Sequence, residues 1–151
     1  DVLCFTSPIL VEPVEVNGRI RVELWAASSA VDTDFTAKLC DVGPDGFVAL
    51  LADGIVRARY RESPRKRSPQ LRPGEPTRFE IDLWDLAHTF LPGHRLRVEI
   101  SSSNFPRFDR NLNTGNEIGV DGEDSAVTAA QQVFHDAERP SALVLPVAAS
   151  A

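Results

Sequence analysis

The chain has 151 residues, of which 42% are hydrophobic and 25% are charged, and its formal net charge is −6. This length fits one domain with a sizeable core. The acidic balance argues against a nucleic-acid partner, because phosphate neutralisation needs a basic face. A membrane partner is not expected either, since no apolar run approaches the ~18 residues of a membrane span.

The chain opens on an apolar run, residues 2–5, and contains no methionine. We therefore expect a single domain over residues 1–151 that is a piece of a longer protein. Cys4 and Cys40 are too few for a disulfide framework and lack the spacing of a zinc site. Two buried thiols in a reducing, cytoplasmic compartment are the favoured interpretation, and a single disulfide between them stays open.

Alternation of apolar and polar residues is the dominant signal along the chain. In residues 19–26, Ile20, Val22 and Leu24 point to one side, while Trp25 and three charged residues point to the other. A period of two with one polar face is typical of antiparallel sheet. In chain order, the predicted strands are residues 2–5, 19–26, 35–42, 47–51, 55–60, 77–84, 94–101 and 143–147.

Turn signals separate these segments. They are Asn17-Gly18, the glycine- and proline-containing residues 43–46, Asp53-Gly54, Pro73-Gly74 and Pro92-Gly93. Many short strands with turns every several residues predict an all-β fold, an antiparallel jelly-roll β-sandwich.

Two segments do not fit this pattern. Residues 125–136 favour helix by composition and strand by alternation, and we favour strand. Residues 61–76 are basic and hold four prolines. An acidic-ligand patch is conceivable there, but a solvated connection between strands is the better interpretation.

Motifs for catalysis are weak. No G-x-S-x-G nucleophile elbow is present. Each of His88, His94 and His135 has a nearby aspartate, but a triad is recognised by geometry, which proximity in sequence does not supply. The nearby aspartates are Asp82, Asp85 and Asp136.

Motifs for metals and cofactors are weak as well. The pair Asp32 and Asp34 offers too few oxygen ligands for calcium. We interpret it as a turn whose aspartates bind nearby backbone amides. We therefore expect no catalytic residue, no metal and no cofactor within this chain.

The stretch SSSNFPRFDRNLNTG, residues 101–115, is unusual for a loop. Phe105 and Phe108 would each forgo about 1.5–3 kcal/mol of burial if left in water. Two interpretations stay open: a loop folded back over its own sandwich, or a loop docked against another domain. The polar residues suited to turn caps or charge pairing are Asn104, Arg107, Asp109, Arg110, Asn111 and Asn113.

The run PGHRLRVEISSSNFPRFDRNLNTG, residues 92–115, closely resembles the C-terminal signature of the X-Pro dipeptidyl-peptidase and cocaine-esterase-like (CocE/NonD) serine hydrolases. Residues 1–10, 32–46, 53–63 and 78–84 resemble the segments that precede it in that family, in the expected order. The resemblance implies a galactose-binding-domain-like jelly roll that follows an α/β-hydrolase catalytic domain. It also places the family's Ser-Asp-His triad in that earlier domain, so no residue here inherits a catalytic role.

From this resemblance we expect an accessory domain whose partner is the catalytic α/β-hydrolase domain of the same polypeptide. The parent would cleave esters or amides through an acyl-enzyme. Residues 104–113 would brace the sandwich, and the sandwich would brace the catalytic domain through a partly polar interface. A homo-oligomer stays open as a further partner.

A different class of function is a carbohydrate- or ligand-binding module. Galactose-binding-like sandwiches often hold sugars on exposed aromatic residues, and the candidates are Trp25, Tyr60 and Trp84. Trp25 and Trp84 fall on the polar faces of their strands, which suits a sugar platform or a surface covered by a partner domain. Fold analogy is the main support for this alternative.

Overall fold

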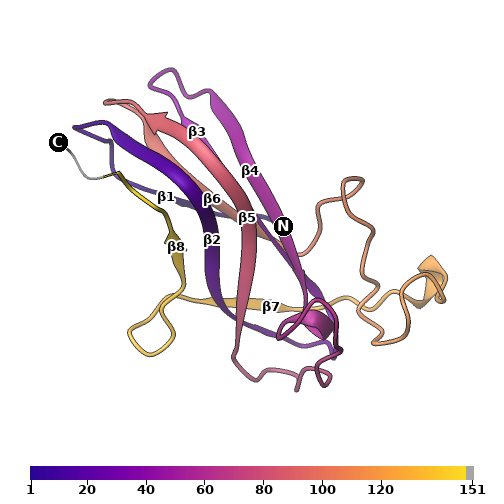
Figure 1. The fold of residues 1–151 in the computed structure, drawn as a ribbon. Helices are drawn as coiled ribbons and strands as arrows, with labels where there is room; N and C mark the ends of the chain where they lie inside the picture. Colours follow the sequence, from indigo (N-terminus) through magenta and orange to yellow (C-terminus); the bar gives the residue numbers. More distant parts are fainter. Residues whose placement is uncertain (149–151) are drawn as a thin grey trace.

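The computed structural model describes residues 1–148, which form eight β-strands and two short 3₁₀ helices (Figure 1). No α-helix occurs in this part of the chain. The elements are β1 (Leu3–Thr6), β2 (Val14–Ser28), β3 (Asp34–Val42), β4 (Val48–Arg57), η1 (Ala58–Tyr60), β5 (Thr77–Phe90), β6 (Arg95–Ser101), η2 (Glu123–Ser125), β7 (Gln131–Phe134) and β8 (Ala142–Val144).

The strands form two antiparallel sheets. The first has the order β1-β6-β3-β4, and the second has the order β5-β2-β7, with β8 also paired to β2. The longest pairing joins β2 to β5, from Val14 opposite Phe90 to Ala26 opposite Thr77. Nonconsecutive strands are neighbours in both sheets, as a jelly roll requires. The predicted all-β antiparallel jelly-roll sandwich is confirmed.

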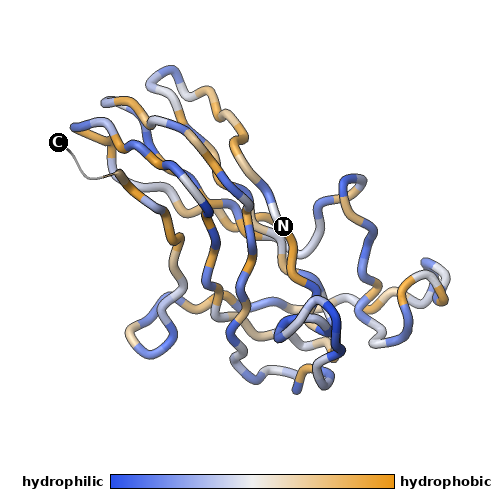
Figure 2. The backbone as a smooth tube through the Cα atoms, in the orientation of Figure 1, coloured by the Kyte–Doolittle hydropathy of each residue, from blue (hydrophilic) through white to orange (hydrophobic). Residues whose placement is uncertain are grey.

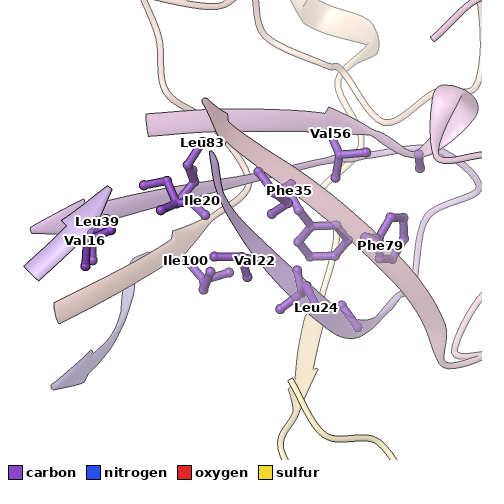
Figure 3. Close-up of a cluster of buried hydrophobic side chains, with 14 of the residues drawn as sticks. Val16, Ile20, Val22, Leu24, Phe35, Leu39, Val56, Phe79, Leu83 and Ile100 are labelled. Atoms are coloured by element: carbon purple, nitrogen blue, oxygen red, sulfur yellow. The ribbon is translucent and has the colours of Figure 1, made fainter. Parts of the chain in front are cut away.

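The core lies between the two sheets and follows the alternation of the sequence. Figure 2 shows hydrophobic and hydrophilic residues alternating along the strands. On β2, the inward residues Ile20, Val22 and Leu24 are at most 3% exposed. Phe35 of β3 packs against Phe79 of β5 with ring centroids 4.9 Å apart, and both are labelled in the close-up of the core in Figure 3. This burial is the main apolar stabilisation of the fold.

Two predicted turns are wrong, because their glycines lie inside strands. Gly18 is part of β2, has φ +131° and sits next to a register shift against β5. Gly54 is buried in β4, where an added Cβ would lie 2.1 Å from the carbonyl oxygen of Asp82. These glycines provide a bulge and a close approach of two strands, which are the other common uses of glycine in sheets. As a result, the predicted strands 47–51 and 55–60 form one strand, β4, followed by η1.

The C-terminal predictions are too long. Within residues 125–136 only β7 is a strand, and β8 covers only the beginning of the predicted strand 143–147. Further along, Val147 makes an isolated bridge to Val16. The basic run 61–76 does connect two elements, η1 and β5, although Ser68 and Leu71 within it are buried.

Both cysteines are free, and Cys40 is buried as predicted. The prediction of a buried thiol is wrong for Cys4, which is exposed because all of β1 is exposed. The two cysteines lie on strands that flank β6, where Cys4 pairs with Glu99 and Cys40 with Arg97. Two strand spacings separate their backbones by about 9–10 Å, beyond the ~7 Å that a disulfide can bridge. Burial raises the pKa of the Cys40 thiol.

The two long sides of the sandwich differ. Strands β3 and β4 pack against β5 on one side. On the other side β1 faces β7 and β8 across an open space, which Phe5, Val133 and Leu143 line together. No helix among residues 1–148 is long and apolar enough to cross a membrane.

Candidate functional site

A long connection, residues 102–130, joins β6 to β7 and carries most of the residues that the sequence singled out. In Figure 1 it extends beyond the sheets and includes η2. Its first part is tied to β4, through hydrogen bonds of Asn104 and Asp109. The connection therefore has a base held on the sandwich and an outer part that projects into solvent.

Two buried aspartates form the base. Asp32 and Asp34 are only 2% and 1% exposed. The side-chain amide of Asn111 donates one hydrogen bond to Asp32 Oδ2 (2.9 Å) and another to Asp34 Oδ1 (2.8 Å). One loop residue thus joins two carboxylates in the wall of the sandwich. The interpretation of these aspartates as partners of nearby backbone amides is wrong. Asp32 does accept a backbone N–H, at 3.1 Å, but it is that of the distant Arg59, and the donors to Asp34 are side chains.

Two arginines neutralise the buried carboxylates. Arg57 donates from Nε to Asp34 Oδ1 and from Nη2 to Asp34 Oδ2, both at 3.0 Å. Arg59, itself 6% exposed, donates from Nε and Nη2 to Asp32 Oδ2 at 2.9 and 2.6 Å. Forked arginine–carboxylate pairs are strong and directional, and removing one partner of a buried pair costs about 3–5 kcal/mol.

Burial and hydrogen bonding shift the pKa values of two charged groups at this base, Asp34 and Arg57. Burial raises the pKa of the Asp34 carboxyl, and the hydrogen bonds from Arg57 and Asn111 only partly oppose it. For Arg57, burial alone would lower the pKa of the guanidinium. The hydrogen bonds to Asp34 and then Asp109 outweigh it, and the pKa is raised well above its ordinary value. Arg57 therefore stays charged and links a buried carboxylate to one on the loop.

A second set of contacts holds the start of the loop. Asn104 Nδ2 donates to Asp53 Oδ2 at 2.9 Å, and Arg107 Nε lies 2.9 Å from the same oxygen. Arg57 Nη2 donates to Asp109 Oδ1 at 3.0 Å. These contacts are more exposed than those of Asn111, because Arg107 and Asp109 are each 59% exposed. The loop is therefore held at two points of unequal burial.

The two phenylalanines of the loop have different surroundings. Phe108 is half-buried and lines a hollow of 210 Å³ with Ile55, Arg57 and Tyr60. Phe105 is 59% exposed, and the guanidinium of Arg110 lies 4.7 Å from its ring centroid. The bond between Phe105 and Pro106 is cis. Polar contacts hold this loop on the sandwich, and only one aromatic residue of the two packs against it.

The outer part of the loop is organised around Asp121. Its carboxylate accepts hydrogen bonds from the Thr114 hydroxyl and from Asn116 Nδ2. Arg67, from the basic run, pairs with Glu117 at 2.7 Å. A hollow of 300 Å³ lies among these residues, with Phe105 on its wall.

The three candidate platform aromatics lie on different elements. Trp25 is half-buried on β2, Tyr60 is in η1 and is 37% exposed, and Trp84 is 63% exposed on β5. Trp25 lies opposite Arg78, six residues from Trp84 along β5, a separation of about 20 Å along the strand. The two tryptophans therefore do not form one sugar-binding platform. Trp84 instead lies beneath the guanidinium of Arg19, at 6.0 Å.

The histidines do not pair with the aspartates nearest in sequence. His88 Nε2 and His94 Nδ1 both bind Asp41 of β3, at 3.0 and 2.8 Å. His135 is exposed and lies edge-on to the ring of Phe5. Of the proposed partners, Asp82 pairs with Arg19 and Asp136 with Arg139. Among residues 1–148, no group of three or more His, Cys, Asp or Glu side chains is arranged to hold a metal ion.

The sequence analysis did not single out Asp41, Asp53, Arg57 and Arg59, nor, in the outer part of the loop, Asn116, Glu117 and Asp121. A signal for the arginines was present in IVRARY, where they alternate with apolar residues in a predicted strand. The aspartates 32 and 34 have the same spacing, and Asp34 is the cross-strand partner of Arg57. Opposite charges with a period of two on neighbouring strands predict a cross-strand ionic ladder.

The two antiparallel sheets and the loop clamped on them define a jelly-roll β-sandwich domain. The sequence model of one protein family, the X-Pro dipeptidyl-peptidase C-terminal non-catalytic domain, matches residues 1–144. The chain belongs to this family, and the predicted membership is confirmed.

The curated relatives of the chain are consistent with this family. The chain is 48% identical over 147 residues to a cocaine esterase of Rhodococcus sp. (strain MB1 Bresler). The alignment covers 97% of this chain and 25% of that protein. It is 33% identical over 122 residues to a putative serine esterase of Mycobacterium bovis, 70% of this chain and 19% of that protein. The chain thus spans about a quarter or less of the curated relatives that it matches.

Solved structures show the same domain. An aminopeptidase from a marine sediment archaeon, Thaumarchaeota archaeon, matches with TM-score 0.93 and 35% identity over 99% of this chain and 26% of that chain. An α-amino acid ester hydrolase matches with TM-score 0.92 and 36% identity over 98% of this chain and 26% of that chain. A CocE/NonD family hydrolase from Staphylococcus aureus, 18% identical over 97% of this chain and 30% of that chain with TM-score 0.77, shows the fold alone.

Proposed function

We propose that this chain is the C-terminal accessory domain of a larger serine hydrolase, with no catalytic triad of its own. It packs on the catalytic α/β-hydrolase domain of the same polypeptide and stabilises it. Support comes from the family and from relatives about four times as long, whose names are those of esterases and of ester and peptide hydrolases. The parent's reaction would be ester or amide cleavage through an acyl-enzyme formed elsewhere in the polypeptide.

The observation that carries this proposal is a loop with a rigid base and an exposed apolar residue. At the base, Asn111 is held by two carboxylates that are almost completely buried. Beyond it, Phe105 is 59% exposed, with Arg110 against its ring. A loop held this firmly has no need of an exposed phenylalanine for its own stability. Apolar groups flanked by charges suit an interdomain interface, which is typically more polar than a core.

The first experiment compares hydrolysis of a nitrophenyl ester and of an aminoacyl-prolyl amide by three samples. These are the longer polypeptide, its part that precedes residue 1, and the 151-residue chain. We expect activity in the longer polypeptide, faster thermal inactivation of the preceding part alone, and none in the 151-residue chain. Hydrolysis by the chain alone would disprove the absence of a triad, and equal half-lives of the first two samples would disprove the stabilising role.

A pair of variants tests the loop itself. Phe105→Ala should leave the melting temperature of the 151-residue chain unchanged and should shorten the half-life of activity in the longer polypeptide. Phe47→Ala is the matched control, because Phe47 is 68% exposed and lies in a different loop. If Phe105→Ala behaves like the control in both samples, the loop does not contact the catalytic domain.

We also propose a cytoplasmic location, supported by the two cysteines. They are free and too far apart to pair within one chain. Thiol titration of the denatured protein should give two free thiols without reductant, and one or none would contradict this location. Self-association stays a separate prediction, which light scattering of the longer polypeptide tests directly.

A further inference from the structure

The open side of the sandwich contains a groove that the clamped loop does not fill. Two hollows meet there, of 180 and 540 Å³, and both are lined by Ile100 and Val133. The smaller one is also lined by Phe5, and the larger one by Leu3 and Phe35. We call these two hollows together the β1–β7 groove. Its wall is largely apolar and comes from both sheets.

Strand β1 is unlike the other strands, because every one of its residues is exposed, whereas even the short strands β7 and β8 have partly buried residues. Leu3 and Phe5 point into the groove and are still 49% and 40% exposed. On β2, in contrast, the inward residues Ile20 and Val22 are at most 3% exposed. An apolar strand with an inward face that nothing covers marks a surface that another group occupies.

A polar atom in the groove also lacks a partner. Gln131 lines the larger hollow, and its Nε2 donates to the Thr33 hydroxyl oxygen at 2.8 Å. Its Oε1 is buried and accepts no hydrogen bond from any residue the structure describes. A buried acceptor without a donor is costly. This cost lies beneath the wall of the groove, and the occupant itself should be apolar to match the side chains that line it.

The position of residue 1 identifies the occupant. Asp1 lines the larger hollow, and its carbonyl oxygen accepts a hydrogen bond from the Ser101 hydroxyl at 3.0 Å. In this family the domain is C-terminal, and the relatives are about four times as long, so the preceding polypeptide joins at this groove. A segment tethered there has a high effective concentration for it.

The groove is also continuous with the loop. Ser102 and Ser103, where the loop leaves β6, line the larger hollow, as do Ala129 and Ala130, where it returns. The face proposed above for the catalytic domain therefore runs from the exposed Phe105 into the groove. We propose that the β1–β7 groove seats an apolar segment of the polypeptide that precedes residue 1. This inference rests on the proposed function and specifies the face used.

Two substitutions on β1 and its flank test this seat. Leu3 and Val2 are similarly exposed, at 49% and 55%, but adjacent residues of an extended chain face opposite sides. Leu3→Asp and Val2→Asp should change the melting temperature of the 151-residue chain by similar small amounts. In the longer polypeptide, Leu3→Asp should lower the melting temperature of the catalytic portion by several degrees more than Val2→Asp. Equal effects of both variants in the longer polypeptide would overturn the proposal.

Cysteine labelling gives a second measurement that does not depend on stability. In a Cys4→Ser background, Ala129→Cys places a thiol in the groove, and Ala126→Cys places the control thiol on an exposed residue of the same segment outside it. The rate at which a maleimide reacts with Ala129→Cys should be lower by about tenfold or more in the longer polypeptide than in the 151-residue chain. The Ala126→Cys thiol should react equally fast in both.

Each outcome of the labelling decides the proposal. Equal rates for Ala129→Cys in both samples would overturn it. Protection that is lost when the longer polypeptide is diluted would also overturn it and assign the groove to a second copy. The inactivation half-lives described above separate this failure from failure of the proposed function. A stabilised catalytic portion with an accessible groove would mean that the domain docks through another face.

Discussion

The core of the sandwich and the base of its loop are both buried, but they are built from opposite materials. Around Phe35 and Phe79 the sheets meet through apolar side chains alone. Around Asp32 and Asp34, equally buried, the contacts are ion pairs, the side-chain amide of Asn111 and the backbone N–H of Arg59. Apolar packing tolerates small shifts of position, whereas forked charge pairs fix distance and direction.

This difference assigns a role to each region. Apolar contacts supply most of the free energy of folding, because burial of apolar area is the largest favourable contribution. The buried charges cost desolvation and add little net stability, so their role at the loop base is to define one position for the loop. The proposed contact of Phe105 with the catalytic domain would need such a defined position.

The largest effect should come from the core. Phe79→Ala removes a ring that is 1% exposed and should lower the free energy of unfolding by about 3–5 kcal/mol. Phe47→Ala, at 68% exposure, should change it by less than about 0.5 kcal/mol. Urea unfolding followed by tryptophan fluorescence measures both. A small loss for Phe79→Ala would mean that the core is not continuous around β5.

The loop base should give a smaller and more local effect. Asn111→Ala removes the donor to two buried carboxylates and should cost about 1.5–3 kcal/mol. The loop should also become sensitive to protease and lose amide protection between residues 104 and 123, while the strands keep theirs. Limited proteolysis and hydrogen exchange measure this.

Asn104→Ala is the graded control for this prediction. Asn104 donates to a single carboxylate, Asp53, whose side chain is 12% exposed. Its loss should cost about 1 kcal/mol and release less of the loop. If Asn104→Ala and Asn111→Ala lower the free energy of unfolding and release the loop equally, the burial of the carboxylates does not determine how firmly the loop is held.

The apolar region was predictable from the sequence and the polar region was not. Alternation placed Ile20, Val22 and Leu24 in the core, where the structure has them. Local rules failed at Gly18 and Gly54, because a glycine that allows a bulge or a close approach has the same sequence signature as one in a turn. The extent of a strand depends on its neighbours, which a local pattern does not contain.

The loop base depends on contacts between distant residues. Asn111 was singled out, but its partners Asp32 and Asp34 lie more than seventy residues earlier. The same holds for His88 and His94, which meet at Asp41 rather than at the aspartates beside them. Spacing in sequence identifies such residues only when both partners lie on neighbouring strands, as Asp34 and Arg57 do.

A third prediction concerns the boundary between the two regions. Phe108 is half-buried beside Arg57 and Ile55, so Phe108→Ala should lower the free energy of unfolding by about 1–2 kcal/mol. Phe108→Leu retains most of the apolar volume and should recover more than half of that loss. A loss as large as that of Phe79→Ala would place Phe108 in the core, and no loss would mean that polar contacts alone hold the loop.

The smallest effect should come from a charge on the outer face of the second sheet. Hydrogen bonds from Arg78 and then Arg21 lower the pKa of Glu23 below its ordinary value of 4.5. A carboxyl with a lowered pKa in the folded state contributes stability above its unfolded pKa and loses it as the pH falls through the folded pKa. Glu23→Gln should therefore reduce stability slightly at neutral pH and leave it unchanged in acid.

Urea unfolding of the wild type and Glu23→Gln at about pH 7 and about pH 3 measures this difference, which should be small because the ion pairs are partly exposed. Glu15→Gln is the control, since Glu15 is an exposed glutamate of the same strand that lies opposite the uncharged Thr89. Its free energy of unfolding should follow the wild type at both pH values. If Glu23→Gln also does so, the charges on this face do not contribute to stability, and the buried charges at the loop base differ from them in function as well as in depth.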